Sequence, residues 1–96
     1  MRIISGNYKN RRINFNKLNI RPTTNFAKES LFNLLNNMHD LNTISILDLF
    51  AGSGNISYEF ISRGAKNITA VDNDIKCINF MKKTKTELEM KNFNII

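Results

Sequence analysis

The apolar residues of this chain form short, near-continuous runs that are separated by polar segments. Runs of this kind are typical of strands buried on both faces of a parallel sheet. They span residues 44–50 and 66–72, and a third run begins at 92–96. Two shorter runs, 1–5 and 11–15, flank a polar turn and predict a β-hairpin.

Helical spacing, with apolar residues three or four positions apart, fills the intervals between these runs. The predicted helices cover 25–38, 55–63 and 75–90. Their predicted inward residues are Ala27, Leu31, Leu34, Leu35 and Met38 in the first helix, Ile56, Phe60 and Ile61 in the second, and Ile75, Ile78, Met81 and Leu88 in the third. Thr23 and Thr24 are candidate N-caps. Strands that alternate with helices after residue 44 predict an α/β fold with a parallel sheet.

One face of this sheet has no predicted cover. Right-handed crossovers place both helices that follow residue 54 on the same face, whereas parallel sheets are normally covered on both faces. The strand at 44–50 also keeps an unpaired apolar edge, which favours aggregation. We therefore expect either that the chain is a fragment or that a second chain supplies the missing strands.

A glycine turn follows the strand at 44–50. Gly52 and Gly54 allow the backbone to turn tightly and to approach a ligand closely, and the helix that follows presents free N–H groups at its N-terminus. The next strand ends at Asp72, 20 residues after Gly52, where a carboxylate can accept hydrogen bonds from both ribose hydroxyls. Strand, glycine turn, helix and terminal acid together indicate a nucleoside-binding βαβ unit.

Two departures from the dinucleotide fingerprint favour S-adenosylmethionine as the cofactor. The third glycine of that fingerprint would fall where this chain has Ser57, so the close helix–strand approach used around a pyrophosphate is lost. Asp48, just before the loop, is unfavourable for a phosphate but can orient loop amides or a ligand ammonium. S-adenosylmethionine has an amino group and a sulfonium and no phosphate. A dinucleotide and a purely structural glycine turn are the alternatives.

The predicted cofactor-binding residues come from the two strand ends and the loop, and they are Asp48, Phe50, Ala51, Gly52, Gly54, Asp72 and Asn73. Phe50 is a candidate either for the pocket wall or for the core. Asn73 and Asp74 are candidates for contact with the adenine. Capping of the next helix is the alternative role, particularly for Asp74.

Positive charge is concentrated at the start of the chain. Residues 1–28 contain seven of the 14 Lys and Arg and no acid, so the rest of the chain sums to −1 and the total is +6. A basic arm beside a near-neutral core indicates a polyanionic partner, above all nucleic acid, and a solvated strand edge is the alternative. Lys9, Arg11 and Arg12 are the candidate RNA contacts of the hairpin. Tyr8 is a candidate for stacking on an exposed base or for packing within the hairpin.

Several classes of site are not indicated. Cys77 is the only cysteine, which excludes an internal disulfide and favours a reducing compartment, the cytoplasm. We expect Cys77 to be a small core residue and His39 to be solvated. No His/Cys cluster has the spacing of a metal site, no segment resembles a signal peptide, and no apolar run approaches the roughly 18 residues that a membrane span needs.

Four motifs occur in order along the whole chain. They are Met1–Gly6, Arg21–Thr24 leading into Glu29–Asn33, Leu47–Gly54, and Ser62–Ala65. This series resembles the type D family of bacterial 16S ribosomal RNA guanine-N2 methyltransferases, which act on the small ribosomal subunit. The resemblance implies a class I methyltransferase Rossmann-like parallel sheet, truncated to the three strands predicted above. Residues 1–20 would form a basic β-hairpin extension, and residues 21–96 the N-terminal half of the S-adenosylmethionine-binding domain.

The resemblance also implies a substrate and roles for particular residues. The substrate would be a guanine exocyclic amine, N2, of small-subunit ribosomal RNA or of its assembly intermediate. Asp72 corresponds to the family's ribose-binding acid, and the residues that correspond to its cofactor loop are Asp48, Gly52 and Gly54. Arg21 and Thr23 lie near the family's active-site cleft, which adds both to the candidate RNA contacts.

The catalytic signature of that family is absent. There, an Asn or Asp followed by Pro-Pro and an aromatic residue binds the amine hydrogens and stacks the base, because the N2 lone pair is delocalised and poorly nucleophilic. This chain has one proline, Pro22, so no catalytic residue is assigned and the chain alone is not expected to complete the transfer. A non-catalytic RNA-binding remnant and, in third place, a nucleotide-dependent reductase are the alternatives.

Overall fold

The computed structural model describes residues 1–15, 18, 23–38 and 40–96. Its elements, in chain order, are α1 (Asn25–Met38), a 3-10 turn η1 (Leu41–Thr43), β1 (Ser45–Leu49), α2 (Asn55–Ser62), β2 (Asn67–Val71), α3 (Ile75–Glu87) and β3 (Phe93–Ile95). All the predicted helices and the three later strands are therefore confirmed, with α3 ending three residues earlier than expected. The predicted boundary after residue 20 lies outside the described residues.

The three strands form a parallel sheet in the order β1-β2-β3. The register sets Ile46 opposite Ile68 and Asp48 opposite Ala70, and this set of residues points towards α2 and α3. Phe93 of β3 points the same way, and its ring lies 6.0 Å from that of Tyr58 in α2. Both helices after the glycine loop thus cover one face of the sheet, as right-handed crossovers require.

The other face of the sheet is open over β1. Leu47 is 61% exposed and Leu49 is 57% exposed, so the prediction that this strand is buried on both faces is wrong for the described residues. A continuous apolar run indicates that both faces of the strand pack against apolar neighbours, but it does not show that this chain supplies those neighbours. The predicted uncovered face and apolar edge are confirmed, because β1 is an edge strand of the sheet.

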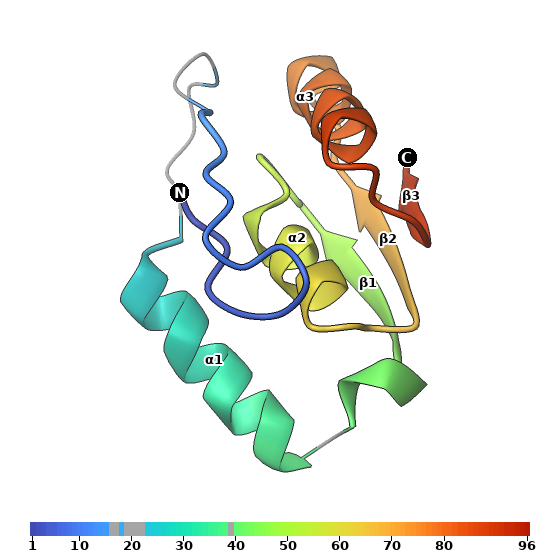
Figure 1. The fold of residues 1–96 in the computed structure, drawn as a ribbon. Helices are drawn as coiled ribbons and strands as arrows, with labels where there is room; N and C mark the ends of the chain where they lie inside the picture. Colours follow the sequence, from blue (N-terminus) through green and yellow to red (C-terminus); the bar gives the residue numbers. More distant parts are fainter. Residues whose placement is uncertain (16–17, 19–22, 39) are drawn as a thin grey trace.

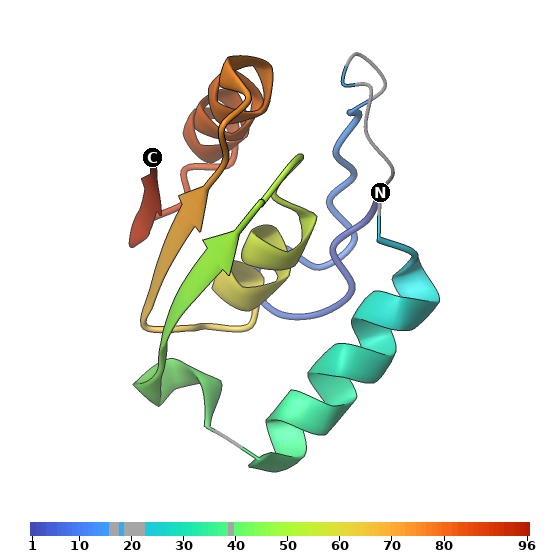
Figure 2. The ribbon, with the colours of Figure 1, turned by 180° about the vertical axis from the view of Figure 1, so that it is seen from behind.

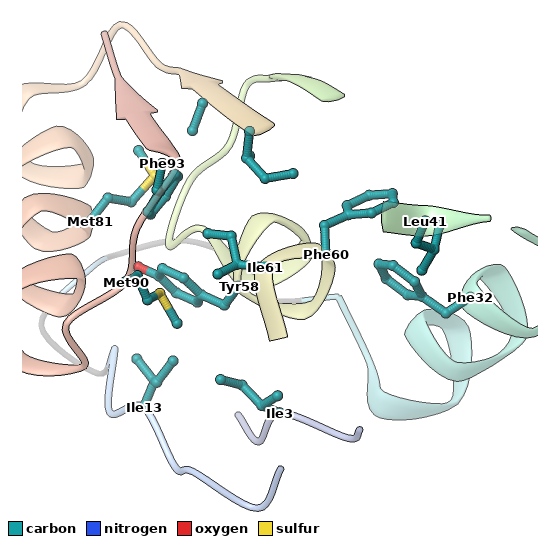
Figure 3. Packing of buried hydrophobic residues seen from close by; sticks show 12 residues of the cluster. Ile3, Ile13, Phe32, Leu41, Tyr58, Phe60, Ile61, Met81, Met90 and Phe93 are labelled. Carbon is teal, nitrogen blue, oxygen red and sulfur yellow. The ribbon is translucent and has the colours of Figure 1, made fainter. Parts of the chain in front are cut away.

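Helix α2 is the centre of the core. Figures 1 and 2 place it between the sheet on one side and the N-terminal residues on the other, and seven of its eight residues are buried. Figure 3 shows its side chains reaching both ways. Phe60 packs edge-on against Phe32 of α1 with 4.5 Å between ring centroids, and Tyr58 packs towards Met81 and Phe93.

Residues 1–15, called the arm below, fold back on themselves against α2. Only one antiparallel bridge forms among the described residues, between Arg2 and Arg12, so the predicted hairpin exists as a short paired loop and not as two regular strands. The arm is held at the C-terminal end of α2, where the Asn7 N–H donates to the Ser62 carbonyl at 2.7 Å. Gly6 has φ +90°, and a Cβ there would lie 1.8 Å from the same carbonyl oxygen, so only glycine permits this approach.

Helix α1 buries a different face from the predicted one. Its buried residues are Lys28 and Phe32, whereas Leu34 and Met38 are 59% and 63% exposed. The reason is a buried carboxylate on α2 that requires the Lys28 ammonium, as described below. The start of α1 follows the sequence, because the Ala27 N–H donates to the Thr24 hydroxyl at 3.1 Å, which confirms the predicted N-cap.

Helix α3 buries Cys77, Met81 and Thr84. Met81 was among its predicted core residues, but Ile75 is 63% exposed, so its predicted place in the core is wrong. Ile75 is the first residue of the helix. An apolar stripe read from spacing overestimates burial at the ends of a helix, where there is no neighbour to pack against.

Candidate functional site

The carboxyl ends of β1 and β2 meet at a pocket of about 390 Å³. Open α/β sheets bind their ligands at this end of the strands. The pocket is lined by Thr23, Asp48, Phe50, Ala51, Gly52, Ser53, Asn55, Ile56, Asp72, Asn73, Asp74 and Cys77. All the predicted cofactor-binding residues except Gly54 therefore surround one space, and Thr23 joins them from the segment before α1.

Asp72 organises the glycine loop. Its Oδ2 accepts a hydrogen bond from the Gly52 N–H at 2.8 Å, and its Oδ1 accepts one from the Asp74 N–H at 2.9 Å. The carboxylate is thereby fixed between the loop after β1 and the turn after β2. Each carboxylate oxygen has a second lone pair, so the group can still accept hydrogen bonds from a ligand.

Asp48 faces the pocket from the end of β1 and is held by α2. The buried Ser57 hydroxyl donates to Asp48 Oδ2 at 2.6 Å. Burial raises the pKa of Asp48, the hydrogen bonds from Ser57 lower it in part, and the negative charge of Asp72 raises it further. Ser57 therefore has a structural role of its own, because its hydroxyl binds the carboxylate that precedes the loop.

Gly54 shapes the turn without lining the pocket. It has φ +88°, and a Cβ at this position would lie 2.6 Å from Cζ of Tyr58 and 3.0 Å from Cγ of Met81. Its N–H donates to the Ala51 carbonyl at 2.9 Å. Gly54 is therefore required for the left-handed backbone and for the close packing of α2 and α3 below the loop.

Phe50 lies at the mouth of the pocket. Its side chain is 82% exposed, so the alternative place in the core is wrong. Its φ of +59° is unusual for a residue with a side chain and costs about 1–2 kcal/mol. The Ala51 N–H, bonded to the Val71 carbonyl at 2.9 Å, holds the backbone that follows.

The turn after β2 contributes three residues with different environments. Asp74 caps α3, because its Oδ1 accepts the Lys76 N–H at 2.9 Å, whereas Asn73 is exposed at the pocket. Cys77 is 2% exposed. Burial first, and then the charges of Asp72 and Asp74, raise the pKa of its thiol, which keeps it protonated. The prediction that Cys77 is a buried core residue is confirmed.

A buried charge cluster next to the pocket was not predicted. Lys28 and Glu59 have fully buried side chains, with 3.2 Å between Nζ and Oε1. Lys28 also donates to the Arg2 carbonyl of the arm and to Asn55 Oδ1, both at 2.8 Å. Asn55 in turn donates through Nδ2 to the Thr23 carbonyl at 3.2 Å. The arm and the pocket-lining Thr23 are thus tied to the first turn of α2.

Glu59 completes this cluster by accepting from three further donors. They are the N–H groups of Ile4 and Ser5, at 2.9 and 3.1 Å, and Nε of Arg63 at 2.8 Å. Burial alone would raise the pKa of Glu59, but the Ile4 N–H, Arg63 and Lys28 outweigh it and hold the pKa below its ordinary value. Burial lowers the pKa of Lys28, and Glu59 opposes that effect only in part. Neither Lys28 nor Glu59 is among the predicted inward residues of its helix, and periodicity alone gives no signal that the two charges pair.

The candidate RNA contacts are distributed around the arm. Lys9, Arg11 and Arg12 are exposed. Tyr8 is partly buried against the core, and its hydroxyl donates to the Glu89 carbonyl at 3.4 Å, which favours the packing role over base stacking. Arg21 and His39 lie outside the described residues.

The sequence predicts neither a metal site nor a membrane-spanning segment. Across residues 1–15, 18, 23–38 and 40–96, no group of three His, Cys, Asp or Glu side chains is placed to hold a metal ion. In the same ranges no helix has the length and apolar character needed to cross a membrane.

Several curated proteins that are similar to this chain are named as ribosomal RNA small subunit methyltransferases. The chain is 41% identical over 97 residues to the ribosomal RNA small subunit methyltransferase D of Buchnera aphidicola, an alignment that covers all of this chain and 49% of that protein. The enzyme of the same name from Haemophilus influenzae is 38% identical over 90 residues, or 93% of this chain and 46% of its own length. The chain spans about half the length of the curated relatives it matches.

The similarity extends to a solved structure. A solved Escherichia coli protein with the provisional name methyltransferase yhhF superimposes with a TM-score of 0.86 and 29% identity, over all of this chain and 51% of that one. This confirms the expected class I methyltransferase Rossmann-like fold. A sequence model of the family described as Conserved hypothetical protein 95 matches residues 1–96. The chain therefore belongs to that family, and the predicted resemblance to the type D ribosomal RNA methyltransferases is correct.

Proposed function

We propose that this chain binds S-adenosylmethionine in the pocket between β1 and β2, as part of an enzyme that methylates the exocyclic N2 of a guanine in small-subunit ribosomal RNA. The observation that supports this choice of cofactor is the charge of the pocket. Its lining includes three carboxylates, Asp48, Asp72 and Asp74, and neither Lys nor Arg among the described residues. Such a site repels the phosphates of a dinucleotide and attracts an ammonium or a sulfonium.

The pocket residues fit the parts of this cofactor. Asp72 would accept hydrogen bonds from the ribose hydroxyls, since its carboxylate is already fixed by Gly52 and Asp74. Asp48 would attract the ammonium of the methionine part, and Asn73 would lie near the adenine. The bound cofactor supplies an electrophilic methyl group on a positive sulphur. The chain's own contribution is to orient it with a carboxylate framework that is formed in advance.

The activation of the acceptor requires more than these residues. A guanine N2 needs a hydrogen-bond acceptor for its hydrogens and an aromatic surface that holds the base in line. The Asn/Asp-Pro-Pro-aromatic signature is absent from the 96 residues. We therefore propose that this chain binds the methyl donor and one part of the RNA, and that it does not complete the transfer alone.

Calorimetric titration with S-adenosylhomocysteine tests the cofactor. We expect binding to the wild type and at least a tenfold loss for Asp72→Asn, which removes the charge and one of two acceptor oxygens. Asp40→Asn, an equal charge change at an exposed residue outside the pocket, should bind as the wild type does. NAD should not compete.

Three results would contradict the proposal: no binding by a folded, monodisperse sample, equal binding by the two variants, or preferential binding of NAD. RNA binding with no cofactor binding would favour the non-catalytic alternative, and preference for NAD would favour a reductase. The three functions are therefore separated by one set of titrations.

A further inference from the structure

A second hollow of about 550 Å³ lies between the arm and α3. Figure 1 shows where these two segments run. It is lined by Arg12, Ile13, Asn14, Phe80, Lys83, Thr84, Glu87 and Leu88, and we call it the arm–α3 groove. It shares no lining residue with the cofactor pocket. Its volume lies within the range of about 300–1,000 Å³ that is usual for ligand sites.

The floor of the groove is apolar and includes one aromatic ring. Ile13 is buried, while Phe80 and Leu88 are partly buried and pack against the core, so each keeps some surface for a ligand. A flat, partly exposed ring beside aliphatic side chains is a surface on which a nucleobase stacks.

The rim of the groove carries one cation from each wall. Arg12 and Lys83 are both exposed. The one acid among the lining residues is Glu87, whose carboxylate lies 3.8 Å from the Lys83 ammonium, with side chains 61% and 76% exposed. A solvated pair of this kind contributes little and is readily exchanged for a stronger anion, so both cations are available to phosphates.

Both segments that form the groove are rich in basic residues. The arm contains Arg2, Lys9, Arg11 and Arg12 and no acid, and α3 contains Lys76, Lys82, Lys83 and Lys85 against Glu87 alone. The net charge of −1 for residues 29–96 concealed this, because half of their acids lie at the cofactor pocket and in the Glu59 cluster. The fold therefore brings one cation of the arm, Arg12, and one of α3, Lys83, to one groove, whereas Lys82 and Lys85 line a separate hollow.

We infer that the arm–α3 groove binds one nucleotide of single-stranded RNA, with its base on Phe80 and Leu88 and its flanking phosphates on Arg12 and Lys83. This inference rests on the proposed function only in taking RNA as the substrate. A combination of stacking surface and paired cations is how proteins bind unpaired nucleotides, whereas a flat basic surface would suit a membrane.

The groove and the cofactor pocket both contact α3. Cys77 of α3 lines the cofactor pocket, and Thr84 of the same helix lines the groove. Seven residues of helix correspond to about 10 Å, which is the span of one to two nucleotides. The groove and the pocket are therefore about two helical turns apart along α3. The arm also contacts the chain just beyond α3, where the Tyr8 hydroxyl donates to the Glu89 carbonyl at 3.4 Å.

The test is fluorescence anisotropy of a labelled, unstructured RNA with the 96-residue chain, repeated over a range of salt concentrations. Lys83→Gln should weaken binding about three- to tenfold at low salt and reduce the slope of log K against log salt by about 0.7, the value for one phosphate contact on a single strand. Lys82→Gln is the matched control, since it makes the same charge change at the preceding exposed residue and lies outside the groove. It should leave affinity within about twofold.

The floor is tested by Phe80→Leu, which keeps apolar bulk and removes the ring. We expect at least a fivefold loss of RNA affinity, as for the loss of one stacked base, with an unchanged circular dichroism spectrum. Equal losses in the Lys82 and Lys83 variants would overturn the inference in favour of a diffuse basic surface. So would wild-type affinity in the Phe80 variant, or no RNA binding by the wild type at low salt.

Titration of the same variants with S-adenosylhomocysteine separates this inference from the proposed function. Cofactor affinity should be unchanged in all three, because none lines the pocket. Absence of cofactor binding together with groove-dependent RNA binding would refute only the cofactor site. Cofactor binding together with RNA binding that ignores the groove would refute only the groove.

Discussion

Helix α2 contacts two neighbouring carboxylate sites that differ in burial and in the number of cations around them. At its first turn, Ser57 binds Asp48 beside Asp72, in a partly open pocket whose described lining has no cation. Near its centre, Glu59 is fully buried and its oxygens meet two cations and two backbone N–H groups. No cation of the described lining balances the carboxylates of the first site, whereas Lys28 and Arg63 balance the charge of Glu59.

This difference separates a ligand site from a structural one. Buried charge is tolerated only when its partners are complete, and Glu59 with Lys28 and Arg63 satisfies this condition without leaving room for a ligand. Asp48 and Asp72 instead keep lone pairs directed at a space. An incomplete set of partners is therefore the better mark of a binding site than a buried charge is.

The largest expected effect is on stability, from Glu59→Gln. The amide removes the charge that compensates Lys28 and turns one acceptor into a donor that faces donors. Breaking a buried ion pair in this way costs about 3–5 kcal/mol, which urea denaturation would measure. Because the pKa of Glu59 is lowered in the folded state, its stabilisation is present above about pH 4.5 and is lost as the pH falls through the folded value. The deficit of the variant should shrink accordingly in acid.

Glu87→Gln is the control for this prediction. It removes one partner of an ion pair that is solvent-exposed, and it should change stability by no more than about 0.5 kcal/mol. If Glu59→Gln were equally mild, the cluster would not hold the arm on α2, and the contrast between the two sites would be lost.

The next effect concerns the attachment of the arm and compares Gly6→Ala with Gly64→Ala. Both glycines have φ near +90°, but a Cβ at Gly64 meets no atom within 4 Å, whereas one at Gly6 lies 1.8 Å from the Ser62 carbonyl. Both variants should lose about 1–2 kcal/mol from the left-handed backbone, and Gly6→Ala should lose about 1–3 kcal/mol more from the clash. Faster hydrogen exchange at the Asn7 amide would locate that extra loss at the arm. Equal stabilities would show that the close approach is not required.

The parts of this molecule that follow from the sequence are those whose partners are near in the chain. The strand, glycine turn and second strand around Gly52 and Asp72 repeat a local pattern, and the Thr24 cap acts on a residue three positions later. Asp48 and Ser57 are nine residues apart, yet the glycine motif does not predict their hydrogen bond, because the motif concerns the backbone at position 57 and not a hydroxyl.

The parts that do not follow depend on partners far along the chain. Lys28 meets Asn55 across 27 residues, and the Ile4 N–H meets Glu59 across 55. Periodicity within α1 does not show that its inward face contains a lysine, so spacing alone predicts the apolar stripe of Leu31, Leu34 and Met38. The arm–α3 groove does not follow from the sequence for the same reason, because the net charge of a segment does not show which side chains share one surface.

The smallest predicted effect is a gain in stability from Asp48→Asn. Because burial raises the pKa of Asp48 above its ordinary value of 3.8, ionisation costs stability as the pH rises through the folded value. Asparagine removes this cost and can still accept the Ser57 hydrogen bond through its oxygen. We expect a gain of at most about 1 kcal/mol at neutral pH, measured by urea denaturation, and a gap from the wild type that narrows towards pH 3.8.

Asp48→Asn should at the same time weaken S-adenosylhomocysteine binding, since an ammonium loses its nearest counter-charge. A variant that gains stability and loses affinity would show that the charge at Asp48 is retained for a ligand and at a cost to the fold. The pH dependence of its stability would be opposite in sign to that of Glu59→Gln. A loss of stability at neutral pH would instead place Asp48 with Glu59 as a structural carboxylate, and would leave Asp72 as the main ligand-binding acid of the pocket.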